Sequence, residues 1–159
     1  MSEHKIDPRV VLFCERLAQL DPGERARLKR SAGKRLAEAT DVLGLFYRVL
    51  PRSVPQGQEE LYFLAATLYP RAEDGGKSDL GASLHQARQA ANSKGLDRRI
   101  EILLDADETQ LPFRLRQAVH FLASNRVRVS WPYLLDDLLD WSHPKRFVQE
   151  RWARSYFAD

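Results

Sequence analysis

The chain has 159 residues, and its 25 Lys and Arg against 22 Asp and Glu give a formal net charge of +3. Its 43% hydrophobic and 30% charged residues are typical of a globular domain and exclude an intrinsically disordered chain. The single cysteine, Cys14, excludes an intramolecular disulfide and a cysteine-based zinc site. No apolar run is long enough to span a membrane, and the N-terminus lacks the apolar core of a signal peptide. We therefore expect a cytoplasmic protein.

Apolar residues recur at helical spacing throughout the first half of the chain. Asp21 followed by Pro22 and Glu24 is a helix start, with a capping side chain, a proline in the first turn and a glutamate at the third position. Proline ends two of the expected helices. The spacing predicts helices near residues 8–20, from residue 22 into a basic stretch, at 43–50 and at 61–68.

The second half begins with a polar, glycine-rich segment at residues 71–79, which is the best candidate for a linker or mobile loop. Thr109 is a candidate cap for one of the helices that follow, and Ser130-Trp131-Pro132 opens another. No segment shows the period-2 alternation of a strand. We expect an all-α protein of about eight to ten short helices, those of the second half lying near residues 80–92, 96–104, 109–122, 131–141 and 147–156.

The sequence offers no recognisable catalytic machinery. Gly75-Gly76-Lys77-Ser78 resembles the end of a phosphate-binding loop, but Arg71 stands where the motif needs its first glycine. The histidines lack the spacing of metal ligands, and there is no nucleophile elbow. We predict no catalytic residue, no metal site, no cofactor and no small-molecule substrate.

Two carboxylates leave an alternative open. Asp136 and Asp140 are one helical turn apart and could share a cation. We interpret them instead as part of a solvated acidic face or a patch that binds a basic partner. A metal-dependent activity lost on their replacement by alanine would identify an enzyme.

The basic residues are unevenly placed and are mostly arginine. Nineteen are Arg and six are Lys, and the planar guanidinium suits phosphates and bases. A GC-rich genome would also favour arginine, and a set of solvated helix faces with local ion pairs would also distribute charge in this way. The segregation of acids from bases nevertheless permits a basic stripe that follows a phosphate backbone. The candidate nucleic-acid-binding residues are Lys29, Arg30, Lys34, Arg35, Arg52, Arg98, Arg99, Arg114, Arg116, Arg126, Arg128, Lys145 and Arg146.

The order of several short motifs resembles the small subunit of the type I-E CRISPR Cascade complex, the CasB family. None of these motifs is catalytic, and the set covers nearly the whole chain. The first half carries Leu20-Asp21, Lys29-Arg30, and Phe46-Tyr47-Arg48 ahead of Pro51. The second half carries Gly81-Ala-Ser-Leu84 with Ala87-Arg88, Arg98-Arg99-Ile100, Leu103-Leu104, Asp105-Ala-Asp107, Leu115-Arg116, Trp131-Pro132-x-Leu134, Trp141 and Trp152-Ala153-x-x-Tyr156-Phe157.

The resemblance implies two adjoining helical bundles, which we place at residues 1–75 and 76–159. It also implies a non-catalytic role in antiviral defence. The protein would brace a CRISPR RNA-guided complex together with other Cascade subunits and a second copy of itself. It would stabilise the R-loop by holding the guide–target hybrid and the displaced DNA strand, so its partners would include CRISPR RNA and target DNA but no membrane.

The resemblance also assigns particular basic residues. Lys29 with Arg30, Arg98 with Arg99, and Arg116 match family positions on the nucleic-acid face, while Arg52 lies near another basic position. The chain departs from the family at Gln117, where a second basic residue is expected, and Arg114 can substitute for it. The rival interpretations are a free-standing helical regulator, which dispersed basic residues disfavour, and a protein-interaction adaptor without a nucleic-acid role.

Overall fold

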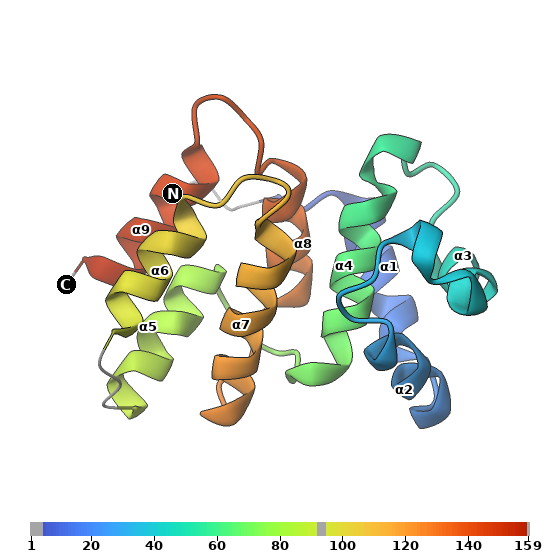
Figure 1. Cartoon of the computed structure of the whole chain (residues 1–159), viewed down its shortest axis with the longest axis horizontal. Coiled ribbons are helices and arrows are strands. Elements are labelled where there is room, and N and C mark those ends of the chain that lie inside the picture. Colours follow the sequence, from blue (N-terminus) through green and yellow to red (C-terminus); the bar gives the residue numbers. More distant parts are fainter. Residues whose placement is uncertain (1–4, 92–94, 159) are drawn as a thin grey trace. The chain divides into compact units, whose positions relative to one another are not determined.

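The computed structural model describes residues 5–91 and 95–158. Within these residues the prediction of an all-α protein is confirmed: the structure has nine α-helices and no strand. The predicted end of one helix at Asn92 lies outside the described residues. The helices are α1 Pro8–Ala18, α2 Pro22–Arg30, α3 Leu43–Val49, α4 Glu59–Leu68, α5 Leu80–Ala90, α6 Leu96–Leu104, α7 Leu111–Ser124, α8 Trp131–Leu139 and α9 Phe147–Phe157 (Figure 1). Short 3₁₀ turns lie at Leu36–Glu38, Thr40–Val42, Gln56–Gln58 and Tyr69–Arg71.

The chain forms two compact units, and each unit is built from two separate segments of the sequence. Unit 1 comprises Met1–Pro70 together with Trp131–Leu139, and unit 2 comprises Arg71–Ser130 together with Asp140–Asp159. Helix α8 thus belongs with the N-terminal helices although it follows them by more than sixty residues in the sequence. The division into bundles at residues 75–76 stays a prediction, whereas the contacts place the first change of unit between Pro70 and Arg71.

Unit 1 is built around aromatic rings. Helix α8 packs against α1 and α4, while α2 packs on α4. The Phe13 ring meets Phe46 and Tyr62 edge to face, with centroids 6.2 and 5.0 Å apart, and Phe46 meets Phe63 in the same way at 5.3 Å. These side chains are fully buried and leave few rotamers open, so they fix the positions of α1, α3 and α4. Cys14 is buried in this unit, as its place on the apolar face of α1 predicts.

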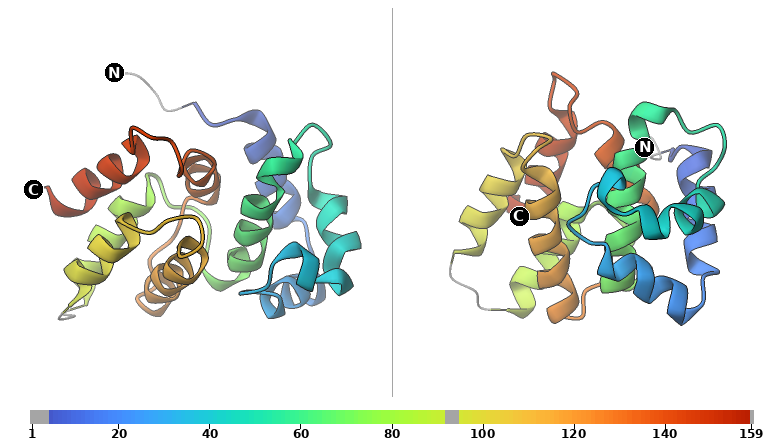
Figure 2. Two further views of the ribbon diagram at one scale, coloured as in Figure 1. Left: turned by 45° about the horizontal axis from the view of Figure 1, so that its top comes forward. Right: turned by 45° about the vertical axis from the view of Figure 1, so that its right-hand side comes forward.

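Unit 2 is a bundle of α5, α6, α7 and α9, in which α9 packs on both α5 and α6 and α7 does the same from another side (Figure 2). The α5–α9 contact is unusually close, because a Cβ placed on Gly81 would lie 2.3 Å from the carbonyl oxygen of Trp152. Trp152 packs against Trp141 with ring centroids 5.1 Å apart, and the Trp141 indole donates to the carbonyl of Ala106 at 2.9 Å. Because Gly81 has no side chain, the C-terminal helix α9 can pack directly against α5.

Two local predictions need correction. The segment 71–79 is not a free linker, because Val129 N–H donates to the Glu73 carbonyl at 2.9 Å and Gly76 N–H donates to the Val129 carbonyl at 3.2 Å. Thr109 does not cap α7, whose N-cap residue is Gln110; the preceding turn is instead closed by Asp107, which accepts from the Gln110 amide at 2.9 Å. The partners of the segment 71–79 lie more than fifty residues away, so they arise only in the tertiary fold.

The acidic cluster of α8 also differs from the prediction of one solvated face. Asp137 is buried, and the Asp136 carboxylate accepts a hydrogen bond from the Asp7 amide at 3.2 Å. Among the residues that the structure describes, no group of three or more His, Cys, Asp or Glu side chains could hold a metal ion. In the same residues, no helix is long and apolar enough to cross a membrane.

The close contact at Gly81 predicts a sharp difference between two glycines. Gly81→Ala should lower the free energy of unfolding by several kcal/mol, because its methyl group meets the backbone of α9. Gly44→Ala should raise it by about 0.5–1 kcal/mol, because that helical position has open space and alanine favours the helix. Urea unfolding of both variants measures the difference, and equal effects would contradict the close α5–α9 contact.

The burial of Tyr62 predicts that the protein loses stability at alkaline pH. Its buried hydroxyl has no hydrogen-bond partner among the described residues, and burial raises its pKa from 10.0 to about 12. Because the folded-state pKa is the higher one, this group's stabilisation is present below pH 10 and is lost as the pH rises towards 12.

Tyr62→Phe should therefore flatten the loss of stability between pH 10 and 12 without lowering stability at pH 7. Tyr156→Phe is the control, because the Tyr156 hydroxyl donates to Asp97 at 2.7 Å and its removal should cost about 1 kcal/mol at pH 7. Denaturant titrations across this pH range test both variants. A large destabilisation by Tyr62→Phe at pH 7 would show that the hydroxyl is bonded.

Candidate nucleic-acid interface

The basic stretch of residues 22–35 separates into structural and exposed cations. Helix α2 begins as predicted: Asp21 accepts from the Glu24 amide at 2.8 Å, and Glu24 accepts from the Asp21 amide at 3.1 Å. Arg25 donates to the carbonyl of Ala18 and Arg27 to that of Asp41, both at 2.8 Å. Each of these two guanidiniums therefore has a structural role, because it connects α2 to a neighbouring segment.

The four predicted residues of this stretch behave differently. Lys29 and Arg30 lie on the exposed side of α2, whose only buried residue is Leu28. Lys34 and Arg35 follow in the exposed segment after the helix, where Gly33 has φ +91°. Within the part of the chain that the structure describes, none of these four side chains makes an ion pair or a hydrogen bond. They form one candidate basic surface.

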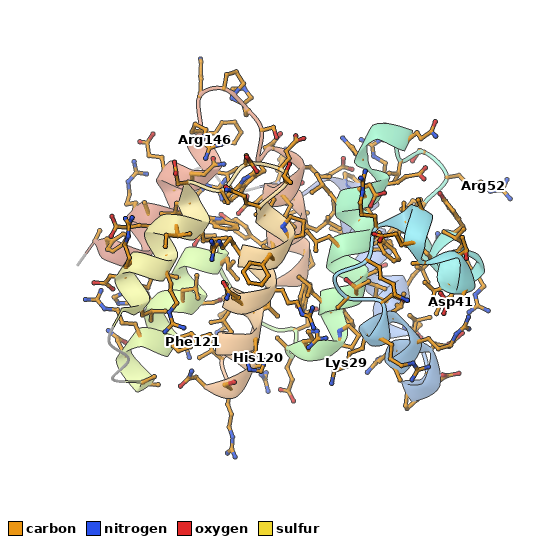
Figure 3. All side chains as sticks on the ribbon, viewed as in Figure 1. Lys29, Asp41, Arg52, His120, Phe121 and Arg146 are labelled. Atoms are coloured by element: carbon orange, nitrogen blue, oxygen red, sulfur yellow. The ribbon has the colours of Figure 1, made fainter. Side chains whose placement is uncertain are left out.

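Arg52 belongs to a different part of unit 1. It extends from the connector between α3 and α4, well apart from Lys29 on α2 (Figure 3). Arg9 holds this connector by donating to the carbonyl of Ser53 at 2.9 Å, and the Asp7 carboxylate binds the same guanidinium. The hydrogen bond from Arg9 lowers the pKa of Asp7, so the pair stays charged at neutral pH. The connector that carries Arg52 is therefore held in place.

In unit 2 the predicted arginines lie on two helices that pack together, α6 and α7. Arg98 and Arg99 are exposed in the first turn of α6, which packs on α7. The Arg99 guanidinium lies over the Phe121 ring of α7, 5.8 Å from its centroid. Arg114 lies over Phe113 at 5.3 Å and donates to Gln117 at 3.5 Å, so the residue that departs from the family pattern contacts the arginine expected to substitute for it.

Arg116 is exposed on α7 and affects an arginine that the sequence analysis missed. The pKa of Arg71 is lowered, first by burial and then by the positive charge of Arg116. The Nε atom of Arg71 is buried without a hydrogen-bond partner among the described residues. Arg71 is the first residue of the glycine-rich segment 71–79 and was not among the predicted basic residues.

The remaining predicted residues differ in their availability. Arg126 is exposed with φ +57°, and Arg128 is exposed but lies 3.6 Å from Glu73. Lys145 is exposed. Arg146 is half-buried: it donates to the carbonyl of Leu104 at 2.8 Å and lies over the Trp141 ring at 5.9 Å. Arg146, labelled in Figure 3, therefore stabilises the segment before α9.

A groove in unit 1 was not foreseen from the sequence. It has a volume of about 550 Å³ and lies between α1, the end of α3 and the connector that follows. Its one sequence signal was Leu12, which lies off the apolar face of α1 formed by Val10, Phe13, Cys14 and Leu17 and is 38% exposed. The groove is lined by Leu12, Arg16, Tyr47, Arg48, Leu50, Pro51, Arg52 and Ser53.

Comparisons with known proteins agree on one family. The model of the family described as CRISPR-associated protein Cse2 matches residues 24–157. A CRISPR-associated protein Cse2 from Thermus thermophilus is 35% identical over an alignment of 159 residues, covering 87% of this chain and 91% of its relative.

Solved structures support the same grouping. CasB from M. ruber has a TM-score of 0.79 and 31% identity, covering 96% of this chain and 94% of that one. A chain in the crystal structure of E. coli Cascade bound to a PAM-containing double-stranded DNA target has a TM-score of 0.68 over 98% of this chain and 100% of its own length. At 21% identity this last likeness shows the fold alone.

Two adjacent basic residues should respond differently to truncation. Arg146→Ala should lower the free energy of unfolding by about 1–2 kcal/mol, because it removes the donor to the Leu104 carbonyl and the contact with Trp141. Lys145→Ala should change it by less than about 0.5 kcal/mol, because that side chain is exposed. Thermal and urea unfolding measure both, and equal stabilities would refute the structural role of Arg146.

Proposed function

The chain belongs to the CRISPR-associated Cse2 family, and on this premise we propose that it is a non-catalytic subunit of a CRISPR RNA-guided Cascade surveillance complex. In this proposal it braces the complex and stabilises the R-loop. Its basic surface holds the guide–target hybrid and the displaced DNA strand. Its partners are other Cascade subunits, a second copy of itself, CRISPR RNA and target DNA.

The observation that carries the proposal is the division among the cations. Arg25, Arg27 and Arg146 donate to backbone carbonyls of their own chain. Lys29, Arg30, Arg98 and Arg116 are exposed, and no ion pair or hydrogen bond of their side chains is found in the described residues. Exposed cations of the second kind remain able to bind phosphate groups. Contacts with phosphates supply most of the affinity in sequence-independent binding of nucleic acid.

The physical task suits such a surface. In RNA-guided recognition, base pairing between guide and target reads the sequence, so a protein subunit needs to hold only backbone and shape. R-loop formation exchanges one duplex for another of similar stability. A few phosphate contacts to the displaced strand are therefore enough to favour the open state. Cations spread over several helices serve this purpose better than a single recognition helix.

The segregation of acidic from basic residues also favours the binding of a second copy of this chain. The stretch of residues 101–108 carries Glu101, Asp105, Asp107 and Glu108, all exposed, while the basic stretch 22–35 lies in the other unit. A head-to-tail arrangement would allow the acidic stretch of one copy to face the basic stretch of the next. Such pairing would favour an ordered array of copies by complementary charge.

The double variant Lys29→Ala/Arg30→Ala tests the proposal in an assembled complex. It should keep the fold and weaken binding of target DNA roughly tenfold. It should also reduce the slope of log affinity against log salt by about one to two, because each lost phosphate contact removes about 0.7–0.9. Filter binding over a salt series, with circular dichroism of the isolated chain, provides the measurement.

Lys5→Ala/Lys77→Ala is the charge-matched control, because both lysines are exposed and lie outside the predicted interface. It should leave the slope unchanged. If both double variants behave alike, the specific surface on α2 is wrong. If the complex assembles and neither double variant alters DNA binding, the chain is a protein-interaction adaptor. Tight, sequence-specific DNA binding by the isolated chain would instead identify a regulator.

A further inference from the structure

The groove of unit 1 combines an exposed aromatic ring, apolar walls and arginines. Of its lining residues, Leu12, Leu50 and Pro51 are apolar, and none is a carboxylate. Its volume of about 550 Å³ falls within the range of about 300–1,000 Å³ typical of ligand sites. An occupant that complements these walls carries negative charge together with a flat apolar part.

Tyr47 presents a fixed ring in this groove. The residue is 48% exposed, although its ring packs edge to face against the buried Phe46 with centroids 5.2 Å apart. Its hydroxyl donates to the Glu59 carboxylate at 2.6 Å, and this hydrogen bond raises the pKa of the hydroxyl. The ring is thus held at two points while much of its surface remains open, which lowers the entropic cost of binding against it.

The three arginines of the groove are not equivalent. Arg48 is paired with Glu24, and Arg16 donates to the Val49 carbonyl at 3.4 Å. Arg52 is exposed, and no hydrogen bond or ion pair of its side chain is found in the described part of the chain. Because Arg9 holds the adjacent Ser53 carbonyl, the connector presents the Arg52 guanidinium from a fixed backbone.

We propose that this groove holds one nucleotide of a single-stranded nucleic acid, with its base stacked on Tyr47 and its phosphate on Arg52. The inference rests on the proposed function and adds a base-binding element to it. Stacking on an aromatic ring beside a cation binds single strands without a preference for sequence, because every base has a flat face. An acidic protein segment is the competing occupant. The fixed, half-exposed ring and the absence of a lining lysine or carboxylate favour the nucleotide.

The test distinguishes binding to the bases of a nucleic acid from binding to its phosphates. The full chain is titrated at low salt with labelled oligothymidylate of about 16 nucleotides and with an abasic deoxyribose-phosphate oligomer of equal length and charge. Wild type should bind oligothymidylate roughly tenfold more tightly than the abasic oligomer, because only the former can stack. Tyr47→Leu should abolish this preference, and Tyr47→Phe, which keeps the ring and loses the hydroxyl, should retain it.

Two further variants serve as controls. Phe113→Leu removes the aromatic ring of Phe113, which is 59% exposed on α7 in the other unit, and should retain the preference. Arg52→Ala should weaken binding of both oligomers by a similar factor, because it removes a phosphate contact that both share. Thermal unfolding of each variant verifies the fold, and the comparison of the two oligomers on wild type keeps the stacking inference testable if Tyr47→Leu is unstable.

Each outcome bears on a different claim. If wild type binds both oligomers equally, the stacking inference is overturned while a phosphate-binding surface stands. If neither oligomer binds at low salt, the proposed nucleic-acid role is overturned, and the inference falls with it. If Tyr47→Leu keeps the preference for bases but fails to enter the assembled complex, the groove receives a protein segment instead.

Discussion

The organisation of unit 2 depends on how closely α9 approaches α5 at Gly81. Because this position carries no side chain, the backbone of Trp152 reaches α5, and the Trp152 ring then packs against Trp141. One turn further along α9, Tyr156 donates to Asp97 on α6, which also pairs with Arg88 of α5. The first turn of α6, with its two exposed arginines, is thus fixed by contacts that begin at one glycine. The basic surface that we propose for unit 2 is therefore carried by a helix whose position depends on this packing.

Arginine has two roles in this structure. Several guanidiniums donate to backbone carbonyl oxygens of other segments, as Arg9, Arg25, Arg27 and Arg146 do. In these positions the long, always charged side chain connects segments that have no backbone hydrogen bond between them. The excess of arginine over lysine is therefore partly a requirement of the fold. An inference about nucleic acid has to rest on the arginines that remain exposed.

Helix positions could be predicted because they depend on local signals. The capping box at Asp21 and Glu24, the prolines at helix ends and the buried stripe of α1 are all present as expected. What could not be predicted depends on distant partners. Glu73 and Gly76 form their hydrogen bonds with Val129. Arg146 donates to the carbonyl of Leu104, forty-two residues away. Charge counts also cannot distinguish Arg27, which donates to a backbone carbonyl, from Lys29, whose side chain makes no hydrogen bond in the described residues. For the same reason the groove at Tyr47 was missed, since its walls come from two helices and a connector.

The placement of α8 in unit 1 has a consequence for synthesis on the ribosome. Trp131, Leu134, Leu135 and Leu138 are buried and come from this helix, which packs on α1 and α4. The N-terminal helices therefore leave the exit tunnel without the residues that complete their core. They have to wait for roughly seventy more residues, at about 5–20 residues per second, before that apolar face can be covered. The nascent chain spends these seconds with an exposed hydrophobic face, so unit 1, although it is the first to be made, cannot complete its core until α8 has been synthesised.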